Sequence, residues 1–228
     1  MTEIAPNPPP ADGVTHFGLH FVRAAPPAAW QVHALAAWRD RLCELGLVGQ
    51  QAERYDGVGF GNLSVRHPHR PGAFIITGTQ TGARAHLAAH DFAIVTRVDI
   101  AANRVRAHGG TAPSSEAMTH AQCYAADPRV GAVFHGHSPL LWHHAAALGI
   151  PATPADIGYG TPGMALAIAA LLASHPPHAD ATVLKMGGHE DGIIAIAATA
   201  DAAGQALLRA LALAGQPPGG SEAASNSP

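Results

Sequence analysis

Residues 130–139 carry the sequence VGAVFHGHSP, in which an apolar run meets a pair of histidines. The run 130–134 has the length and composition of a buried strand, and Pro139 suits the first turn of a helix. Between them stand His135 and His137. Alternate residues of a strand project to one side, so these two imidazoles can meet the same metal ion. Such a pair also arises by chance in a chain with 16 histidines, so it requires support from other residues.

The sequence on both sides of this stretch predicts helices and short strands. Apolar residues recur at helical spacing over 27–47, which predicts a helix that opens the domain. Further helices are expected at 114–126, from about Pro139, at 162–173 and at 201–213. Besides 130–134, β-branched runs predict strands at 73–77, 93–98, around Val105, 182–186 and 192–197. A central sheet with helices before and after it predicts an α/β fold, a three-layer α/β/α sandwich.

The composition is typical of one globular domain, with 228 residues of which 47% are hydrophobic and 13% charged. The ends are rich in Pro, Gly and Ser, which predicts unstructured segments at 1–14 and 215–228 around a folded body at 15–214. A net charge of −3 without a basic block argues against a nucleic-acid partner. Neither a signal peptide nor a membrane-spanning apolar run is evident, so we expect a cytoplasmic protein without a membrane partner. Cys43 and Cys123 lack C-x-x-C spacing and are expected to be buried thiols.

Two residues outside the first stretch extend the metal hypothesis. His189 lies in the sequence GGHEDG, in a turn between two expected strands from which a side chain can reach a sheet end. Three protein ligands leave a coordination position open, as in catalytic zinc sites. Glu116 stands at the start of an expected helix and can move a proton to or from a bound substrate, although alone it would suit a capping residue. Glu190 and Asp191 are candidates for orienting His189.

In their order along the chain, these motifs resemble the class II aldolase/adducin family, which includes fuculose-1-phosphate aldolase-like proteins. The resemblance covers about 30–212 and rests on GNLSVR at 61–66, PSSE at 113–116, His120, HGHSP at 135–139 and Gly188-His189. It implies a mixed, mainly antiparallel central sheet. It also implies that His135, His137 and His189 hold a divalent metal, usually zinc (Zn²⁺), with Mn²⁺, Fe²⁺ or Mg²⁺ as alternatives, and that Glu116 is the catalytic acid/base.

The resemblance further implies a metal-dependent lyase that cleaves a carbon–carbon bond of a small hydroxy-carbonyl substrate in a retro-aldol reaction, through a metal-stabilised enediolate. Related epimerases tend to carry Asp in place of Glu116, so the Glu favours cleavage. Decarboxylation of a hydroxy or keto acid is the second choice. A non-catalytic adducin-like interaction domain is the alternative from another class, and a hydrolase with a metal-activated water does not explain the other motifs. Related proteins are homotetramers, so we expect one here.

Sugar-phosphate members of the family bind phosphate with a Gly-Asn pair, a Thr/Ser-Gly turn and the Ser-Ser pair before the Glu. In the turn, this chain has Gln80 where Gly would let the backbone approach a phosphate, which leaves a non-phosphorylated substrate open. Tyr159 lies in a Gly-bounded loop and is expected to reach a neighbouring subunit's site, as a tyrosine does in related aldolases. The predicted substrate-binding residues are Gly61, Asn62, Thr79, Ser114, Ser115 and Tyr159. Three further histidines, His120, His143 and His144, are left out of the site.

Overall fold

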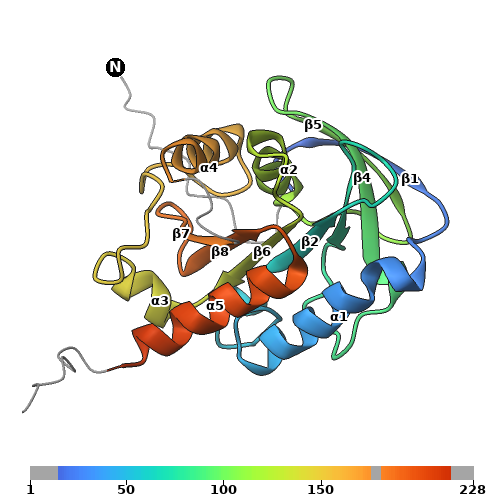
Figure 1. Ribbon diagram of the computed structural model, residues 1–228. Coiled ribbons are helices and arrows are strands. Elements are labelled where there is room, and N and C mark those ends of the chain that lie inside the picture. The colour runs from blue at the N-terminus through green and yellow to red at the C-terminus, as the bar shows by residue number, and fades with distance from the viewer. Residues whose placement is uncertain (1–14, 176–180, 217–228) are drawn as a thin grey trace, which may run out of the picture.

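The computed structural model describes residues 15–175 and 181–216, within which eight strands form one sheet (Figure 1). The strands are β1 (Gly18–Arg23), β2 (Asn62–Arg66), β3 (Phe74–Thr77), β4 (Phe92–Asp99), β5 (Arg104–Gly109), β6 (Ala132–His137), β7 (Ala181–Lys185) and β8 (Gly192–Ala197). Their order across the sheet is β1-β5-β4-β3-β2-β6-β8-β7. Only β1 and β5 pair in parallel among these described strands, which confirms a mixed, mainly antiparallel sheet.

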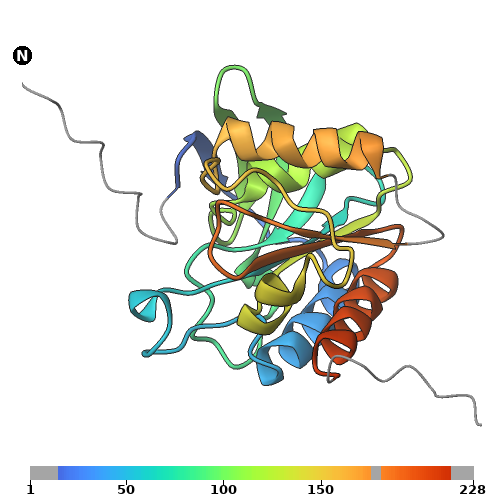
Figure 2. The ribbon, with the colours of Figure 1, turned by 90° about the vertical axis from the view of Figure 1, so that its left-hand side faces the viewer.

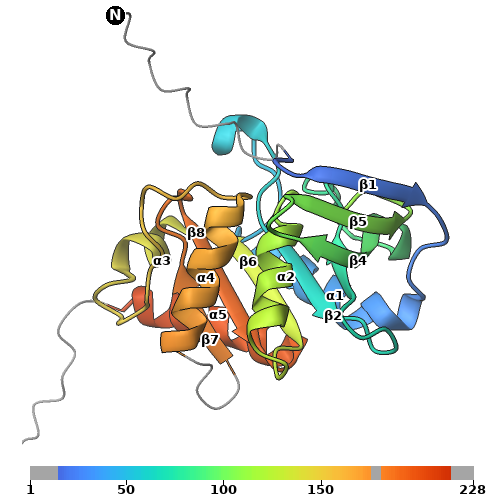
Figure 3. The ribbon, with the colours of Figure 1, turned by 90° about the horizontal axis from the view of Figure 1, so that it is seen from above.

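Helices cover both faces of the sheet, as the three-layer prediction requires. The described helices are α1 (Ala29–Glu44), α2 (Ala117–Ala126), α3 (Pro139–His144), α4 (Pro162–Ser174) and α5 (Ala200–Ala214), with short 3₁₀ turns η1 (Tyr55–Gly57) and η2 (Ala89–Asp91). Figure 2 shows α4 above the sheet and α1, α3 and α5 below it. Seen from above, α2 and α4 lie side by side over the sheet (Figure 3).

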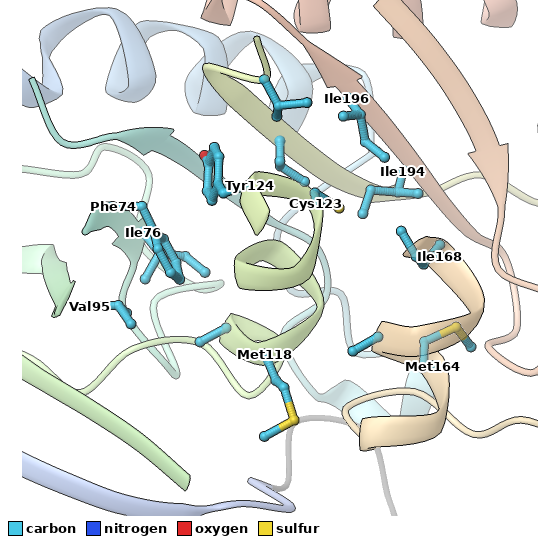
Figure 4. Close-up of a cluster of buried hydrophobic side chains, with 14 of the residues drawn as sticks. Phe74, Ile76, Val95, Met118, Cys123, Tyr124, Met164, Ile168, Ile194 and Ile196 are labelled. Carbon is cyan, nitrogen blue, oxygen red and sulfur yellow. The ribbon is translucent and has the colours of Figure 1, made fainter. Parts of the chain in front are cut away.

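The hydrophobic core has two parts, one on each face of the sheet, because neighbouring side chains of a strand point in opposite directions. In β8, Ile194 and Ile196 join the cluster under α2 and α4 (Figure 4), whereas Ile193 and Ala195 join the cluster with α1 and α5. A strand buried on both faces has no polar alternate positions, which explains the continuous apolar run GIIAIA.

The bounds of several elements differ from the sequence-based expectations, and two strands, β1 and β2, were not expected. Helix α2 begins at Ala117 rather than 114, because residues 114–116 form a turn in which the Ala117 N–H donates to the Ser114 carbonyl (3.1 Å). Strand β6 continues through His137, beyond the expected end at 134. A strand, β1, precedes α1, so the expectation that a helix opens the domain was wrong; this strand is at the sheet edge and only partly buried, and edge strands have a weak apolar pattern.

The expectations for the chain ends, the cysteines and membrane-spanning segments can be compared with the described residues. Residues 1–14 and most of 215–228 lie outside the described residues, so the predicted domain bounds stay a prediction. The two cysteines are free, Cys123 buried as expected and Cys43 only half-buried. No helix in the described ranges combines the length and the apolar content that crossing a bilayer requires.

Candidate metal centre and active site

Strand β6 directs His135 and His137 to the same face of the sheet, the one covered by α2 and α4. Both imidazoles share this face with Val133, whose side chain packs in the α2 and α4 cluster. Gly136 faces the other way, where a Cβ would lie 2.9 Å from the carbonyl oxygen of Leu47. The two imidazoles therefore lie on one face, as the H-x-H spacing predicted, and the glycine between them lets β6 approach the chain after α1.

His189 completes the cluster from the tight turn between β7 and β8. The turn is closed by hydrogen bonds from the His189 N–H to the Met186 carbonyl (3.1 Å) and from the Gly192 N–H to the His189 carbonyl (2.9 Å). The Nε2 atoms of His135, His137 and His189 lie 3.1–3.2 Å from one another, and all three side chains are buried. Tetrahedral zinc with bonds of about 2.0–2.1 Å places its ligand atoms about 3.3 Å apart, so the three nitrogens fit one divalent ion.

The protonation of these histidines also suits metal binding, which needs neutral imidazoles. Burial lowers the pKa of His137 well below its ordinary value, and burial lowers the pKa of His189 to about 4 despite the opposing effect of Glu116. The Nδ1–H of His135 donates to the Ile193 carbonyl (3.1 Å), which directs the Nε2 lone pair toward the other two histidines.

Glu116 lies beside the three histidines at the N-terminus of α2. Its Oε2 atom is 3.0 Å from His135 Nε2, and its Oε1 atom is 3.9 Å from His189 Nε2. The Nδ2 of Asn62, whose backbone pairs with His135 across β2 and β6, donates to Glu116 Oε2 (2.8 Å). Burial alone raises the pKa of the Glu116 carboxyl, but His135, His189 and the Asn62 hydrogen bond outweigh burial and hold the pKa well below its usual range. An oxygen that accepts the Asn62 amide N–H fits a carboxylate at this position.

A cavity of about 260 Å³ opens on this cluster. Its lining contains Glu116, His137, His189 and every residue predicted to bind substrate, namely Gly61, Asn62, Thr79, Ser114, Ser115 and Tyr159. The structure thus brings together residues from distant parts of the chain that the sequence had grouped by motif. Their individual roles stay predictions.

Three residues of the cavity wall, Gly49, Gly61 and Gln80, have a positive φ, and two of them bear on substrate binding. Gly61 has φ 72°, and a Cβ there would lie 2.6 Å from Val48 Cγ1, so only glycine suits this position. Gln80 has φ 56°, a conformation that glycine adopts more readily, and its exposed side chain stands at the cavity rim. Gln80 therefore keeps a backbone conformation that suits glycine and adds a side chain at the cavity rim.

Tyr159 lies in the site of its own chain. Its ring stacks on His189, with ring centroids 4.4 Å apart and an interplanar angle of 26°. The preceding residues lie over the His189 turn so closely that a Cβ on Gly188 would collide with the Ile157 carbonyl oxygen. The expected reach of Tyr159 to a neighbouring subunit's site stays a prediction.

The other histidines and acidic residues considered from the sequence do not join the three-histidine cluster. His120 is buried and contacts Ser64 Oγ through Nδ1 (2.6 Å), while His143 and His144 are exposed. Glu190 is exposed, whereas the Asp191 carboxylate accepts a hydrogen bond from Tyr55 rather than from His189.

The sequence did not single out two residues that shape the site. Arg39 is 3% exposed, lines the cavity, and donates to the carbonyls of Thr81 (3.3 Å), Gly82 and Ala85 (both 3.0 Å), which holds the turn containing Gln80. Tyr55 packs its ring edge against His137, with centroids 4.7 Å apart. An arginine on an amphipathic helix and a tyrosine in a polar loop give no local signal of these contacts, because both depend on tertiary structure.

Comparisons with known proteins identify the family of this chain. Residues 41–214 match the family described as Class II Aldolase and Adducin N-terminal domain. The methylthioribulose-1-phosphate dehydratase of Gluconacetobacter diazotrophicus is 32% identical over 103 residues, which are 44% of this chain and 46% of that protein. The match thus spans about half the length of this relative.

Solved structures share the fold at low sequence identity. An L-fuculose 1-phosphate aldolase superposes with a TM-score of 0.60 at 19% identity, covering 83% of this chain and 84% of that one. YgbL from Klebsiella pneumoniae superposes with a TM-score of 0.59 at 20% identity, covering 81% and 86%. Since the family match extends over more than half of its residues, the chain belongs to the class II aldolase/adducin family.

Proposed function

We propose that this protein is a divalent-metal-dependent lyase acting on a small hydroxy-carbonyl compound, with carbon–carbon bond cleavage as its reaction. The observation that carries the proposal is the convergence of three buried imidazole nitrogens within 3.2 Å of one another, with the Glu116 carboxylate 3.0 Å from one of them. Three protein ligands leave room for substrate, and Zn²⁺ is the first choice of metal, ahead of Mn²⁺, Fe²⁺ and Mg²⁺. The aldolase and dehydratase activities named for its relatives support a lyase in general.

The proposed reaction assigns separate roles to the three histidines, to Glu116 and to Tyr159. A divalent ion held by His135, His137 and His189 supplies a Lewis acid that polarises substrate oxygens. Glu116, held as a carboxylate, accepts the proton of the substrate hydroxyl as the carbon–carbon bond breaks, and then returns a proton to the carbon that has gained the electron pair. Tyr159 covers His189 with its ring, which keeps water from that side of the site.

The hydrogen bonding of Asn62 supports a substrate that donates hydroxyl groups. Because the Asn62 Nδ2 donates to Glu116, the carbonyl Oδ1 of the same amide must find its partner elsewhere. Among the described residues, this buried Oδ1 and the buried Glu116 Oε1 have no hydrogen-bond partner. Buried acceptors without a donor are costly, so a hydroxyl of the substrate is the natural partner for each. We therefore assign Asn62 to a substrate hydroxyl rather than to a phosphate.

Dehydration is the second candidate reaction, favoured by the relative named methylthioribulose-1-phosphate dehydratase. It needs the same two functions, a Lewis acid at the carbonyl and a carboxylate that moves a proton, but it releases water in place of a carbonyl fragment. Decarboxylation of a hydroxy or keto acid, the second choice from the sequence, becomes the third candidate; it also leaves an electron pair next to a polarised carbonyl.

Product analysis of the metal-loaded protein tests the proposal. Phosphorylated and non-phosphorylated hydroxy-carbonyl compounds would be screened by mass spectrometry for cleavage fragments, loss of water and release of carbon dioxide. Glu116→Gln, which keeps the shape and loses the proton acceptor, should lower turnover about 10²–10⁴-fold while the metal content stays unchanged. Metal loss in this variant would instead make Glu116 a ligand.

Failure to turn over any compound, together with failure to bind metal, would favour the non-catalytic adducin-like alternative. The proposal includes a homotetramer, which light scattering would test. It also includes a cytoplasmic location, which cell fractionation would test. A monomer at assay concentration would contradict the tetramer but not the site, because one chain contains all the predicted site residues.

A further inference from the structure

The loop of residues 50–59 reaches the back of the histidine cluster. Its ends are joined by paired hydrogen bonds between Gly49 and Phe60 (2.9 and 2.7 Å), and its turn η1 projects from the body of the molecule (light blue in Figure 2). From this loop the Tyr55 hydroxyl donates to Asp191 Oδ2 (2.7 Å) and accepts from Arg54 Nη2 (2.7 Å). The loop is thereby tied to the residue two positions after His189.

The imidazoles of His135 and His137 are held in different ways. His135 donates its Nδ1–H to the Ile193 carbonyl, the usual arrangement for a metal-binding histidine. The Nδ1 of His137 is buried and has no hydrogen-bond partner among the residues that the structure describes. Two aromatic rings contact His137 instead: Tyr55 edge-on with centroids 4.7 Å apart, and Phe60 at 5.5 Å. The orientation of the His137 imidazole is therefore fixed by contacts with these two rings rather than by a hydrogen bond at Nδ1.

Both ends of the Tyr55–Asp191 hydrogen bond have an unfavourable backbone. Tyr55 has φ 50° and Asp191 has φ 59°, in the left-handed region that side-chain-bearing residues rarely adopt. Strained residues persist where the surrounding structure holds them, and they concentrate at functional sites. Arg54 adds to this hold, since its guanidinium lies over the Phe60 ring at 4.3 Å and donates to the Gly46 carbonyl (2.7 Å).

We propose that Tyr55 is a positioning residue that orients His137 for metal binding, through its ring contact and through the hydroxyl bond that fixes this ring against Asp191. The inference rests on the proposed function, in which His137 is a metal ligand. The motifs that carry the family resemblance do not include this tyrosine, and its hydroxyl is hydrogen-bonded to Asp191 and Arg54. Its effect should therefore appear in metal affinity and coordination geometry.

The experiment compares two tyrosines that each lose a hydroxyl. Tyr55→Phe removes the bonds to Asp191 and Arg54. Tyr124→Phe, on α2, removes a buried bond to Ser64 of β2 (2.7 Å). Zn²⁺ affinity is measured by chelator competition, and the visible spectrum of the Co²⁺-loaded protein reports the coordination geometry. We expect Tyr55→Phe to weaken Zn²⁺ binding about tenfold and to alter the Co²⁺ spectrum, with Tyr124→Phe close to wild type in both.

A third variant separates orientation from general damage. Asp191→Asn keeps an acceptor for the Tyr55 hydroxyl and tolerates the left-handed backbone, so its Zn²⁺ affinity should stay close to that of the wild type. Wild-type affinity and spectrum in Tyr55→Phe, or equal losses in Tyr55→Phe and Tyr124→Phe, would overturn the inference while leaving the metal site intact. Absence of metal binding by the wild type would overturn the proposed function and this inference with it.

Discussion

Gln80 combines an unfavourable backbone with a position at the mouth of the cavity. Its left-handed φ of 56° costs about 1 kcal/mol relative to glycine, and neighbouring contacts from Arg39 to the Thr81 and Gly82 carbonyls hold the turn in place. Because strained residues concentrate at functional sites, we infer that the Gln80 side chain contacts the substrate.

We predict that Gln80→Gly raises the free energy of unfolding by about 1 kcal/mol, because glycine relieves the backbone strain. The same change should raise kcat/KM for phosphorylated relative to non-phosphorylated substrates, since the backbone N–H groups become accessible to a phosphate. Urea denaturation and paired kinetics measure the two effects. Asn103→Gly, also at a left-handed position (φ 50°) but outside the cavity lining, is the control for substrate preference. An unchanged preference in Gln80→Gly would show that the side chain does not select the substrate.

At the residue scale, the sequence identified the metal-binding candidates because their chemistry is local. His135 and His137 follow from strand periodicity, and His189 and Glu116 from motifs that keep their order in the family. Asn62 was predicted to bind substrate and does line the cavity, but its hydrogen bond to Glu116 depends on the pairing of β2 with β6. Tyr55 could not be found from the sequence, because its left-handed backbone and its contact with His137 depend on tertiary structure.

Strand β6 is the element on which the site depends most. It lies between β2 and β8 near one end of the sheet and carries two of the three histidines. Its apolar run was easy to recognise, because β6 has a neighbour on each side and is buried on both faces. Strands β1 and β2 were missed because the first is a partly exposed edge strand and the second follows a glycine-rich stretch that obscures its start.

We predict that Gly136→Ala disturbs β6 and the metal site together. The added Cβ would lie 2.9 Å from the Leu47 carbonyl oxygen and would push the strand away from that backbone. Overpacking of this kind costs about 1–3 kcal/mol, so urea denaturation should show lower stability and chelator competition weaker Zn²⁺ binding. Gly158→Ala is the matched control, since a Cβ there meets nothing within 4 Å. Equal behaviour of the two variants would argue against tight packing behind β6.

For the whole molecule, the buried histidines make stability depend on pH. Burial lowers the pKa of His189 from 6.5 to about 4, and burial lowers the pKa of His120 from 6.5 to about 3. Below about pH 6.5 the unfolded chain therefore binds protons that the folded chain does not, and acid favours unfolding.

The unfolding free energy of the metal-free protein should accordingly fall as the pH is lowered from 6.5 toward 4, by up to about 1.4 kcal/mol per pH unit for each such histidine. Urea denaturation in the presence of a chelator measures the slope. His120→Gln should make the slope shallower, whereas His143→Gln, at an exposed position, should leave it unchanged. A flat profile between pH 6.5 and 5 would contradict the burial of neutral imidazoles.

The metal content of the purified protein tests the central claim most directly. Wild type, His189→Ala and the exposed-site control His143→Ala would be analysed for bound metal after supplementation with Zn²⁺ and removal of excess ion. The three-histidine site predicts about one ion per chain in the wild type and in the control, and a loss of this ion in His189→Ala. A wild type that binds no metal, or a His189→Ala variant that binds as much as the wild type, would contradict the account.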